Sequence, residues 1–310
     1  MKIDLKLMRK KGFNSVCLKD NKKKIEIINS KKKFSKISSC PICKSKKRQK
    51  ILVKFGIEIF KCLNCDVDYS SKKPNDFSDL YSTEHLKNHY LNVYDRSRKY
   101  KMNRFGKERI SILKKYKKKG NLLDFGCGTG WFLEIAKKNY NSYGIEFSDQ
   151  LREFLFKKYE IKTFKNLSKL PKSLKFDIIT AFDVIEHVEN PAIFLSNLRK
   201  FLKKDGIALI YTPNKDSLGF SYLKFFNNLL CPPAHLFYFS EKSFRYLLKK
   251  TNFKFVSHQT RGLDFGDIYA YLNEDRNTKL ANLILKSSNQ LQKIFDELKF
   301  SNHSRYIIKK

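Results

Sequence analysis

Long apolar runs are absent from this 310-residue sequence, and acidic residues are scarce. No apolar run approaches the roughly 20 residues that span a membrane, and the first residues, Met1 to Asp4, contain no apolar signal region. These two absences predict a cytoplasmic protein without a transmembrane segment. The hydrophobic fraction of 41% is nevertheless large enough to bury a sizeable core, in one large domain with small additions.

The shortage of acidic residues leaves a formal charge of +35, from 65 basic and 30 acidic residues. Such a charge is compatible with binding to RNA or to an anionic membrane. Lysine, however, far outnumbers arginine and is spread along the whole chain, and asparagine, isoleucine and phenylalanine are abundant, as AT-rich coding DNA produces. We therefore interpret the charge first as compositional and second as a polyanion-binding surface.

Four of the seven cysteines form two Cys-x-x-Cys pairs, Cys40 with Cys43 and Cys62 with Cys65. Residues 50–61 predict a hairpin that brings the pairs together, so that four thiolates complete a tetrahedral Zn²⁺ shell. Such a shell has no open position, and we expect the zinc to be structural. A redox role is disfavoured because no βαβ pattern surrounds either pair. This use of cysteine indicates a reducing compartment.

Residues 121–130, Asn-Leu-Leu-Asp-Phe-Gly-Cys-Gly-Thr-Gly, predict a buried strand that runs into a glycine-rich turn, and helical spacing follows. Strand, turn and helix in this order open a nucleotide-binding βαβ unit. Glycine permits the tight turn and the close approach of a ligand at Gly126, Gly128 and Gly130. Glu146, at the end of the next predicted strand, can hold a ribose diol. NAD and S-adenosylmethionine both fit this pattern.

Two residues separate these ligands. Trp131 stands where the dinucleotide fingerprint needs a third small residue, which disfavours a pyrophosphate. Asp124 ends the strand, where its carboxylate suits an ammonium group better than a phosphate. A ligand with an amino-acid end and no phosphate therefore fits best. Residues 124–130 resemble the first motif of class I S-adenosylmethionine-dependent methyltransferases.

The resemblance covers roughly residues 39–310 and also rests on the segments 183–187 and 235–240. It implies an α/β fold: a Rossmann-like, seven-stranded, mostly parallel sheet with helices on both faces, plus a small N-terminal zinc ribbon. A turn at 205–206 and a fifth strand at 207–212 are expected, and in the N-terminal arm residues 25–28 predict a short strand. The predicted parts are a basic N-terminal arm (1–38), the ribbon (39–75), a helical connector (76–118) and the methyltransferase domain (119–310), with a helical insertion (262–302) before its last strand.

The cofactor-binding residues implied by the resemblance are Asp124, Gly126, Cys127, Gly128, Gly130, Glu146, Phe147, Asn166 and Asp183. Many family members place an acidic or amide residue against the adenine, and this sequence offers only the amide of Asn166 there. The segment Asp183-Val-Ile-Glu-His-Val188 resembles the one in which the family places an acidic residue and a Glu-His pair beside the transferable methyl group.

The catalytic candidates are Glu186, His187 and His235, because histidine suits proton removal at neutral pH and both histidines are expected just past sheet strands. Alternatively, Glu186 and His187 only cap a helix or brace the cofactor loop, and His235 only packs beneath the preceding loop. Asp183, Glu186 and His187 could also bind a divalent metal that orients a hydroxyl group.

The predicted function is methyl transfer from S-adenosylmethionine to a small-molecule or glycan acceptor, a sugar or nucleotide-sugar methylated on O or C. The aromatic-rich segments 81–94 and 220–240 suit carbohydrate stacking, and similar ribbon-bearing enzymes are associated with surface-polysaccharide modification. The alternative is a zinc-ribbon methyltransferase acting on rRNA or tRNA. A non-enzymatic module with a relic cofactor site is disfavoured by the intact loop and Glu146.

Overall fold

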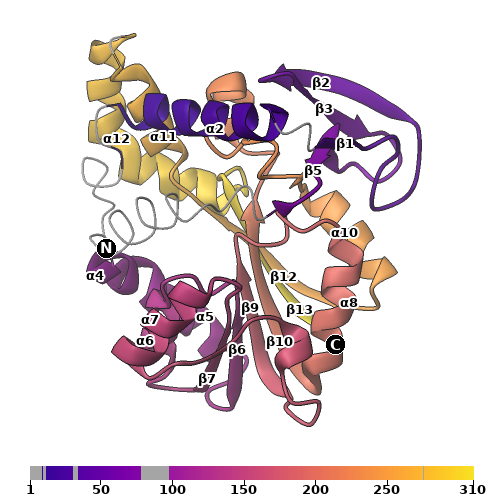
Figure 1. Cartoon of the computed structure of the whole chain (residues 1–310). Coiled ribbons are helices and arrows are strands. Elements are labelled where there is room, and N and C mark those ends of the chain that lie inside the picture. Colours follow the sequence, from indigo (N-terminus) through magenta and orange to yellow (C-terminus); the bar gives the residue numbers. More distant parts are fainter. Residues whose placement is uncertain (1–8, 10–11, 31–33, 78–97, 275) are drawn as a thin grey trace.

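The computed structural model describes residues 9, 12–30, 34–77, 98–274 and 276–310. A seven-stranded sheet forms the centre of the C-terminal part, and a four-stranded sheet forms the N-terminal ribbon (Figure 1). None of the described helices combines the length and the apolar character needed to cross a bilayer. The aromatic and histidine-rich stretch 81–94 lies outside the described residues.

The large sheet has the strand order β12-β13-β10-β9-β6-β7-β8. All neighbours pair in parallel except β13, which is antiparallel to β10 and β12. The chain leaves β6 towards β7 and β8 and then returns to β9 on the other side of β6, so the carboxyl edge between β6 and β9 is a topological switch point, where open α/β sheets bind ligands. The strands are β6 (Asn121–Phe125), β7 (Asn141–Ile145), β8 (Lys162–Phe164), β9 (Phe176–Phe182), β10 (Leu202–Pro213), β12 (Lys254–Arg261) and β13 (His303–Lys309).

Helices cover both faces of this sheet (Figure 1). Alternate strand residues enter two different cores, as the period of two in a strand requires: Leu122 and Ile178 pack with α5 and α6, whereas Leu123 and Ile179 pack with α8 and α10. The predicted fold class is thereby confirmed. The covering helices are α5 (Lys107–Lys114), α6 (Trp131–Ala136) and α7 (Asp149–Tyr159) on one face, and α8 (Pro191–Phe201) and α10 (Glu241–Lys250) on the other.

The remaining helices connect the strands or lie at the carboxyl edge. The π-helix η3 follows α4 and leads directly into α5, which agrees with the helical spacing expected before the first strand. Between β12 and β13, in the region where a helical insertion is expected, lie the helices α11 and α12. These elements are α4 (Arg98–Lys101), η3 (Met102–Gly106), η4 (Leu167–Lys169), α9 (Leu218–Leu223), η5 (Lys224–Phe226), α11 (Asp264–Leu272) and α12 (Thr278–Glu297).

The N-terminal arm differs from its prediction. Residues 25–28 belong to a helix, α2 (Phe13–Ser30), and not to a strand. The reason is tertiary: Asn14, Asn21 and Ile25 recur at helical spacing and are buried. The Ser15 hydroxyl donates to Glu274, just beyond α11, with an oxygen-to-oxygen distance of 2.7 Å. The arm is therefore attached to the helical insertion.

The start of β10 also differs. The sequence predicts a turn at 205–206 and a strand only from 207, but the strand already begins at Leu202. Its pairing with β9 shifts register between Leu202 and Ile207. The turn residues are thus taken up as an irregularity inside one strand.

The ribbon sheet has the order β11-β4-β3-β2, and its β2–β3 hairpin turns at Gly56, as predicted. Its fourth strand does not come from the ribbon, because β11 follows His235 in the methyltransferase part of the sequence. A separate two-stranded ladder joins β1 to β5. The strands are β1 (Phe34–Lys36), β2 (Arg48–Lys54), β3 (Ile57–Cys62), β4 (Asp68–Ser70), β5 (Lys72–Pro74) and β11 (Phe237–Tyr238).

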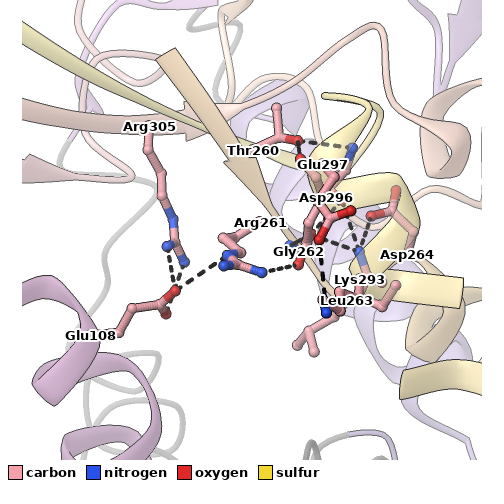
Figure 2. A network of polar contacts seen from close by, with 12 residues as sticks. Glu108, Thr260, Arg261, Gly262, Leu263, Asp264, Lys293, Asp296, Glu297 and Arg305 are labelled. Atoms are coloured by element: carbon pink, nitrogen blue, oxygen red, sulfur yellow. Dashed lines mark hydrogen bonds and ion pairs between the residues drawn. The ribbon is translucent and has the colours of Figure 1, made fainter. Parts of the chain in front are cut away.

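A polar network fastens α5 and the helical insertion to the last two strands (Figure 2). Glu108 of α5 lies 2.9 Å from Arg305 of β13 and 3.3 Å from Arg261 of β12. On its other side, Arg261 donates to Asp296 of α12 at 2.8 Å. This network fixes the insertion above the carboxyl edge of the sheet.

Candidate functional site

The four ribbon thiols converge on one point. Their sulfur atoms all lie within 4.8 Å of one another, with Sγ–Sγ distances of 3.5 Å for Cys40 and Cys65 and 3.4 Å for Cys43 and Cys62. A tetrahedral Zn²⁺ with bonds of about 2.3 Å separates its thiolates by about 3.8 Å. The four cysteines predicted as zinc ligands therefore have the donor type and the spacing that one zinc ion requires.

Each cysteine pair is folded by the residue that follows it. Lys44 and Asp66 adopt left-handed backbone conformations, with φ of 64° and 65°. Their amides donate back to the carbonyl oxygens of Cys40 and Cys62, at 2.8 and 3.0 Å. These turns direct both thiols of a pair to the same side.

The glycine loop after β6 makes the tight turn that its sequence indicates. Gly126, Gly128 and Gly130 have φ of 74°, 51° and 68°, a region that side chains rarely permit. A Cβ at Gly126 would lie 2.8 Å from Val184, and one at Gly130 would lie 2.2 Å from Leu155. The loop therefore packs directly against the segment after β9 and against α7, with no room for side chains at these two glycines.

Glu146 closes the other side of this loop. Its carboxylate is buried and accepts hydrogen bonds from the amide of Gly128 at 3.0 Å and from the amide of Ser148 at 2.9 Å. Burial raises the pKa of Glu146. The next residue, Phe147, has an exposed ring. A carboxylate and an aromatic face thus lie side by side at the end of β7, a combination suited to a ribose and its base.

Asp124 ends β6 as a second buried carboxyl group. It accepts a hydrogen bond from the Thr180 hydroxyl of β9 at 2.7 Å. Burial raises the pKa of Asp124 to about 7, above that of an ordinary aspartate. A cationic partner would offset the desolvation of its charged form, which fits the ammonium group expected from the sequence.

Two further cofactor candidates have structural partners. Cys127 is buried against β7, where a Cβ at Gly144 would lie 2.6 Å from its sulfur, and burial raises the pKa of its thiol well above the usual value. Asn166 is exposed, and its side-chain oxygen caps η4 by accepting from the amide of Ser168 at 3.1 Å. The contact of Asn166 with adenine stays a prediction.

Glu186, His187 and His235 come together although His235 lies far from the other two in the sequence. One ligand atom from each lies within 4.8 Å of those of the other two, and the imidazole centroids of the two histidines are 4.5 Å apart at 82°. Each Nδ1 faces a backbone carbonyl at 2.8 Å, that of Ala234 for His187 and that of Leu229 for His235. A carbonyl only accepts, so each Nδ1 carries the proton and each Nε2 is the basic nitrogen.

The surroundings of this cluster shift the pKa values of His235 and Glu186 in opposite directions. Burial lowers the pKa of His235 well below the ordinary value, so its imidazole is neutral at pH 7. Burial, with the nearby Asp183, raises the pKa of Glu186 well above the ordinary value. Glu186 Oε2 accepts from the Thr212 hydroxyl at 3.0 Å, whereas Oε1 is buried without a hydrogen-bond partner among the described residues. An unsatisfied buried oxygen beside two basic nitrogens indicates a place for a ligand or an ion.

Two residues near this edge escaped the sequence predictions. His303 begins β13, and its Nε2 lies 3.4 Å from Oδ1 of Asp183. Arg109 of α5 is buried, with its guanidinium 3.8 Å from the ring centre of Phe182 and 4.7 Å from that of Tyr211. The sequence does contain a signal for His303, namely its position at the start of the last strand. An antiparallel strand starts at the edge where its parallel neighbours end, so its first residue lies near the site.

The chain matches the model of one protein family, described as a methyltransferase domain, over residues 94–258, slightly more than half of its length. The matched region contains the glycine loop, Glu146 and the three clustered side chains. The chain therefore belongs to the methyltransferase domain family.

Curated relatives agree with this family over part of the chain. The mitochondrial ubiquinone biosynthesis O-methyltransferase of Dictyostelium discoideum is 31% identical over 119 residues, which cover 32% of this chain and 37% of that protein. The ubiquinone biosynthesis O-methyltransferase of Pelagibacter ubique is 34% identical over 101 residues, 30% of this chain and 42% of that protein. The chain spans less than half of the length of these relatives.

Solved structures with a similar backbone are more distant. A phosphoethanolamine N-methyltransferase 2 of Haemonchus contortus is 16% identical, with a TM-score of 0.49, over 78% of this chain and 62% of that one. An S-adenosylmethionine-dependent methyltransferase of Clostridium acetobutylicum is 12% identical, with a TM-score of 0.47, over 72% of this chain and 98% of that one.

Proposed function

We propose that this chain transfers the methyl group of S-adenosylmethionine to a hydroxyl group of a small-molecule acceptor, and that its ribbon holds one structural zinc ion. Membership of the methyltransferase domain family supports the reaction class. The observation that carries the proposal is the contact between the imidazoles of His187 and His235, each with Nε2 as its basic nitrogen, in the segment after β9 that packs against the glycine loop. Four converging thiols support the zinc.

The cofactor fits the loop by its chemistry. Asp124 would hold the ammonium group and Glu146 the ribose diol, because both are buried carboxyl groups at the ends of adjacent strands. The ring of Phe147 would cover the adenine, with Asn166 as a further contact. Asp183, which follows β9, would line the side of the site nearest the transferable methyl group.

The chain has two tasks in the reaction. S-adenosylmethionine supplies a methyl group already activated by its sulfonium, so the protein must align the acceptor oxygen in line with that carbon and remove the oxygen's proton. The Nε2 atom of His235 or His187 would take this proton as the oxygen–carbon bond forms and the carbon–sulfur bond breaks. Positioning supplies most of the acceleration, and a general base adds about 10²–10⁴-fold.

A divalent cation is the second candidate for the same place. Glu186, His187 and His235 present one carboxylate oxygen and two imidazole nitrogens within 4.8 Å, a donor set that suits a transition metal. The backbone carbonyls that hold both Nδ1 protons are the usual second contacts of metal-bound histidines. In that case the metal would orient and acidify the acceptor hydroxyl.

The acceptor is the finer part of the proposal. The matched relatives are named for O-methyl transfer in ubiquinone biosynthesis, which supports a hydroxyl group of a small molecule. The aromatic segment 220–240 favours a sugar or nucleotide-sugar as the acceptor. In such an acceptor the methylated atom could also be carbon. RNA is the alternative that the charge alone favours.

Substitution of the two histidines tests the reaction. We expect His235→Gln or His187→Gln, whichever residue is the base, to lower kcat by about 10²–10⁴-fold while the affinity for S-adenosylmethionine, measured by calorimetry, stays within about twofold. The other variant serves as the control for packing. Chelation that abolishes turnover without removing the ribbon zinc would favour the cation. Undiminished kcat in both variants and in the double variant would contradict both mechanisms.

Mass spectrometry identifies the acceptor. The enzyme with isotopically labelled S-adenosylmethionine is incubated separately with nucleotide-sugars, phenolic quinone precursors and cellular RNA. Label on a small-molecule hydroxyl is the expected result, and label confined to RNA would contradict the proposal.

A further inference from the structure

The ribbon sheet ends in a strand that lies next to a catalytic candidate in the sequence. Strand β11, two residues after His235, pairs antiparallel with β4 of the ribbon, with Phe237 opposite Tyr69 and Tyr238 opposite Asp68. The amide of Ser70 adds a hydrogen bond to the carbonyl of Leu236 at 3.0 Å. The other edge of β4 pairs with β3, which ends at the zinc ligand Cys62. Two ladders that share β4 therefore connect the ribbon thiols to the segment that follows His235.

A buried ion pair strengthens this connection. Lys215, which follows β10, has a side chain only 5% exposed, and its Nζ lies 2.8 Å from Oδ1 of Asp68 and 3.3 Å from Oδ2 of Asp66. The hydroxyl of Ser240 donates to Asp66 at 2.5 Å. Asp66 directly follows Cys65, and Asp68 lies two residues further on. The turn of the second cysteine pair is therefore tied to both ends of the segment 215–240.

On its other side, the same segment contacts the loop after β9, which carries Glu186 and His187. The amides of Leu236 and Phe237 donate to the carbonyl of Glu186 at 2.8 and 3.3 Å. His187 bonds through Nδ1 to the carbonyl of Ala234. Residues 234–237 thus lie between the ribbon and the loop after β9. They are hydrogen-bonded to β4 on one side and to Glu186 and His187 on the other. The hydrophobic cores are continuous across this boundary, because Cys40, Cys65 and Tyr69 belong to the same buried cluster as Leu236 and Phe237.

We infer that the zinc ribbon is a positioning element of the active site: its segment 66–70 fixes residues 234–237 and thereby sets His235 against His187. The inference rests on the proposed function. Asp68 and Lys215 are positioning residues in it, since neither belongs to the Glu186–His187–His235 cluster. A ribbon that served only as a detachable recognition module would not need its β4 strand paired on both edges and buried against the catalytic segment.

A matched pair of substitutions tests this inference with the zinc shell intact. Asp68→Asn keeps the shape of the side chain but removes the charge that pairs with Lys215. Asp216→Asn makes the same change at a neighbouring exposed aspartate with no ion pair to Lys215 among the described contacts. We expect Asp68→Asn to lower kcat by about tenfold or more, part of the general-base contribution, with KM for S-adenosylmethionine and its affinity within about twofold. Asp216→Asn should leave kcat unchanged.

Imidazole signals provide a readout that needs no acceptor. In ¹H–¹³C spectra of the six histidines, the His235 and His187 signals, assigned by His→Gln variants, should shift in Asp68→Asn and broaden on removal of zinc from the wild-type protein. The signal of His258, buried beside β13, should not move in Asp68→Asn. A failed methyl-transfer assay would sink the proposed function but leave this spectral test valid.

Two results would overturn the inference. One is identical behaviour of Asp68→Asn and Asp216→Asn in kcat and in the histidine spectra. The other is zinc-free protein that keeps the wild-type His235 signal and full kcat. Zinc removal could unfold the whole chain, with loss of all native histidine signals. In that case the comparison of Asp68→Asn with Asp216→Asn, both with zinc bound, decides the question.

Discussion

The carboxyl group of Asp124 illustrates how one residue can make cofactor binding depend on pH. Its pKa is raised to about 7 by burial, so the free protein holds it largely protonated below pH 7 and ionised above. An ammonium group binds the ionised form. Affinity for S-adenosylmethionine should therefore be fully present above pH 7 and fall as pH decreases, by up to about tenfold per unit.

Calorimetry between about pH 5 and 7, a range in which an α-amino group of pKa about 7.8 is mostly charged, measures this dependence. Proton release should accompany binding at the lower end of the range. Asp124→Asn should bind more weakly, with an affinity that no longer varies with pH. A wild-type affinity that is flat over the range would show that Asp124 does not meet the ammonium group.

Gly128 and Gly56 form a matched pair for the glycine loop. Both have positive φ, 51° and 76°, so valine at either position should destabilise the chain by about 1–2 kcal/mol. Only Gly128 belongs to the loop, and a Cβ at Gly56 meets nothing within 4 Å. We expect Gly128→Val to abolish binding of S-adenosylmethionine and Gly56→Val to preserve it. Equal affinity of the two variants would remove the loop from the cofactor site.

Residues of the candidate site were predictable where the chain itself places them together. The glycine loop and both cysteine pairs are contiguous motifs, and their spacing alone determines which atoms converge. The contact of His187 with His235 was not predictable, because it depends on how the segment 231–240 folds back across β9. Arg109 and the partner of His303 escaped for the same reason: Arg109 lies against Phe182 of β9 and His303 faces Asp183, which follows β9, and both contacts join residues far apart in the sequence.

At the scale of elements, the network of Figure 2 shows what holds the helical insertion in place. Asp296 of α12 is 7% exposed and accepts from Arg261 and from the amide of Gly262, at 2.8 and 3.1 Å. It also accepts from the buried hydroxyl of Ser301 at 2.6 Å. Asp296→Ala leaves these donors unsatisfied, which should lower the free energy of unfolding by about 2–3 kcal/mol.

Glu297 offers the control on the same helix. Its side chain is 66% exposed and forms a loose ion pair with Lys293, at 4.0 Å. Glu297→Ala should therefore change the free energy of unfolding by less than about 0.5 kcal/mol. Urea denaturation monitored by circular dichroism measures both variants. Equal effects would mean that the network does not stabilise the insertion.

Element types followed from local pattern where burial is one-sided. The buried strand expected at the start of residues 121–130 and the helix expected after the turn match β6 and α6, because a short apolar run and helical spacing determine them. Residues 25–28 misled for the opposite reason. Three isoleucines among these four residues favour a strand locally, but the packing of α2 against α11 of the insertion selects a helix.

For the whole molecule, the sequence pattern separated the ribbon (39–75) from the methyltransferase domain (119–310) by a connector, and the structure joins the two directly through β11. No local signal could reveal this, since a two-residue strand has no periodicity of its own. The segment from His235 to Ser240 is constrained on both sides, by the loop after β9 and by the ribbon. A change in the ribbon can therefore reach the catalytic candidates without passing through the glycine loop.

The net charge belongs to the molecule as a whole and distinguishes its possible acceptors. With 65 basic and 30 acidic residues, at least 35 basic side chains cannot be matched one to one with an acidic partner. If RNA were the acceptor, these charges would contact phosphates, and affinity would fall with salt at a log–log slope of about −0.7 per contact with a single strand. A small-molecule acceptor meets only the few charges that line its pocket.

We expect the second behaviour, because the clustered imidazoles and the buried carboxyl groups define a compact site, whereas the lysines follow no single motif. Methyl transfer to small-molecule pools should vary by less than about threefold between 50 and 300 mM salt, since groups in a pocket are screened much less than exposed ones. Cellular RNA, assayed in parallel with the same labelled cofactor, is the comparison. Strong labelling of one RNA nucleotide that disappears as salt rises, with no labelled small molecule, would make the charge functional and overturn the acceptor class.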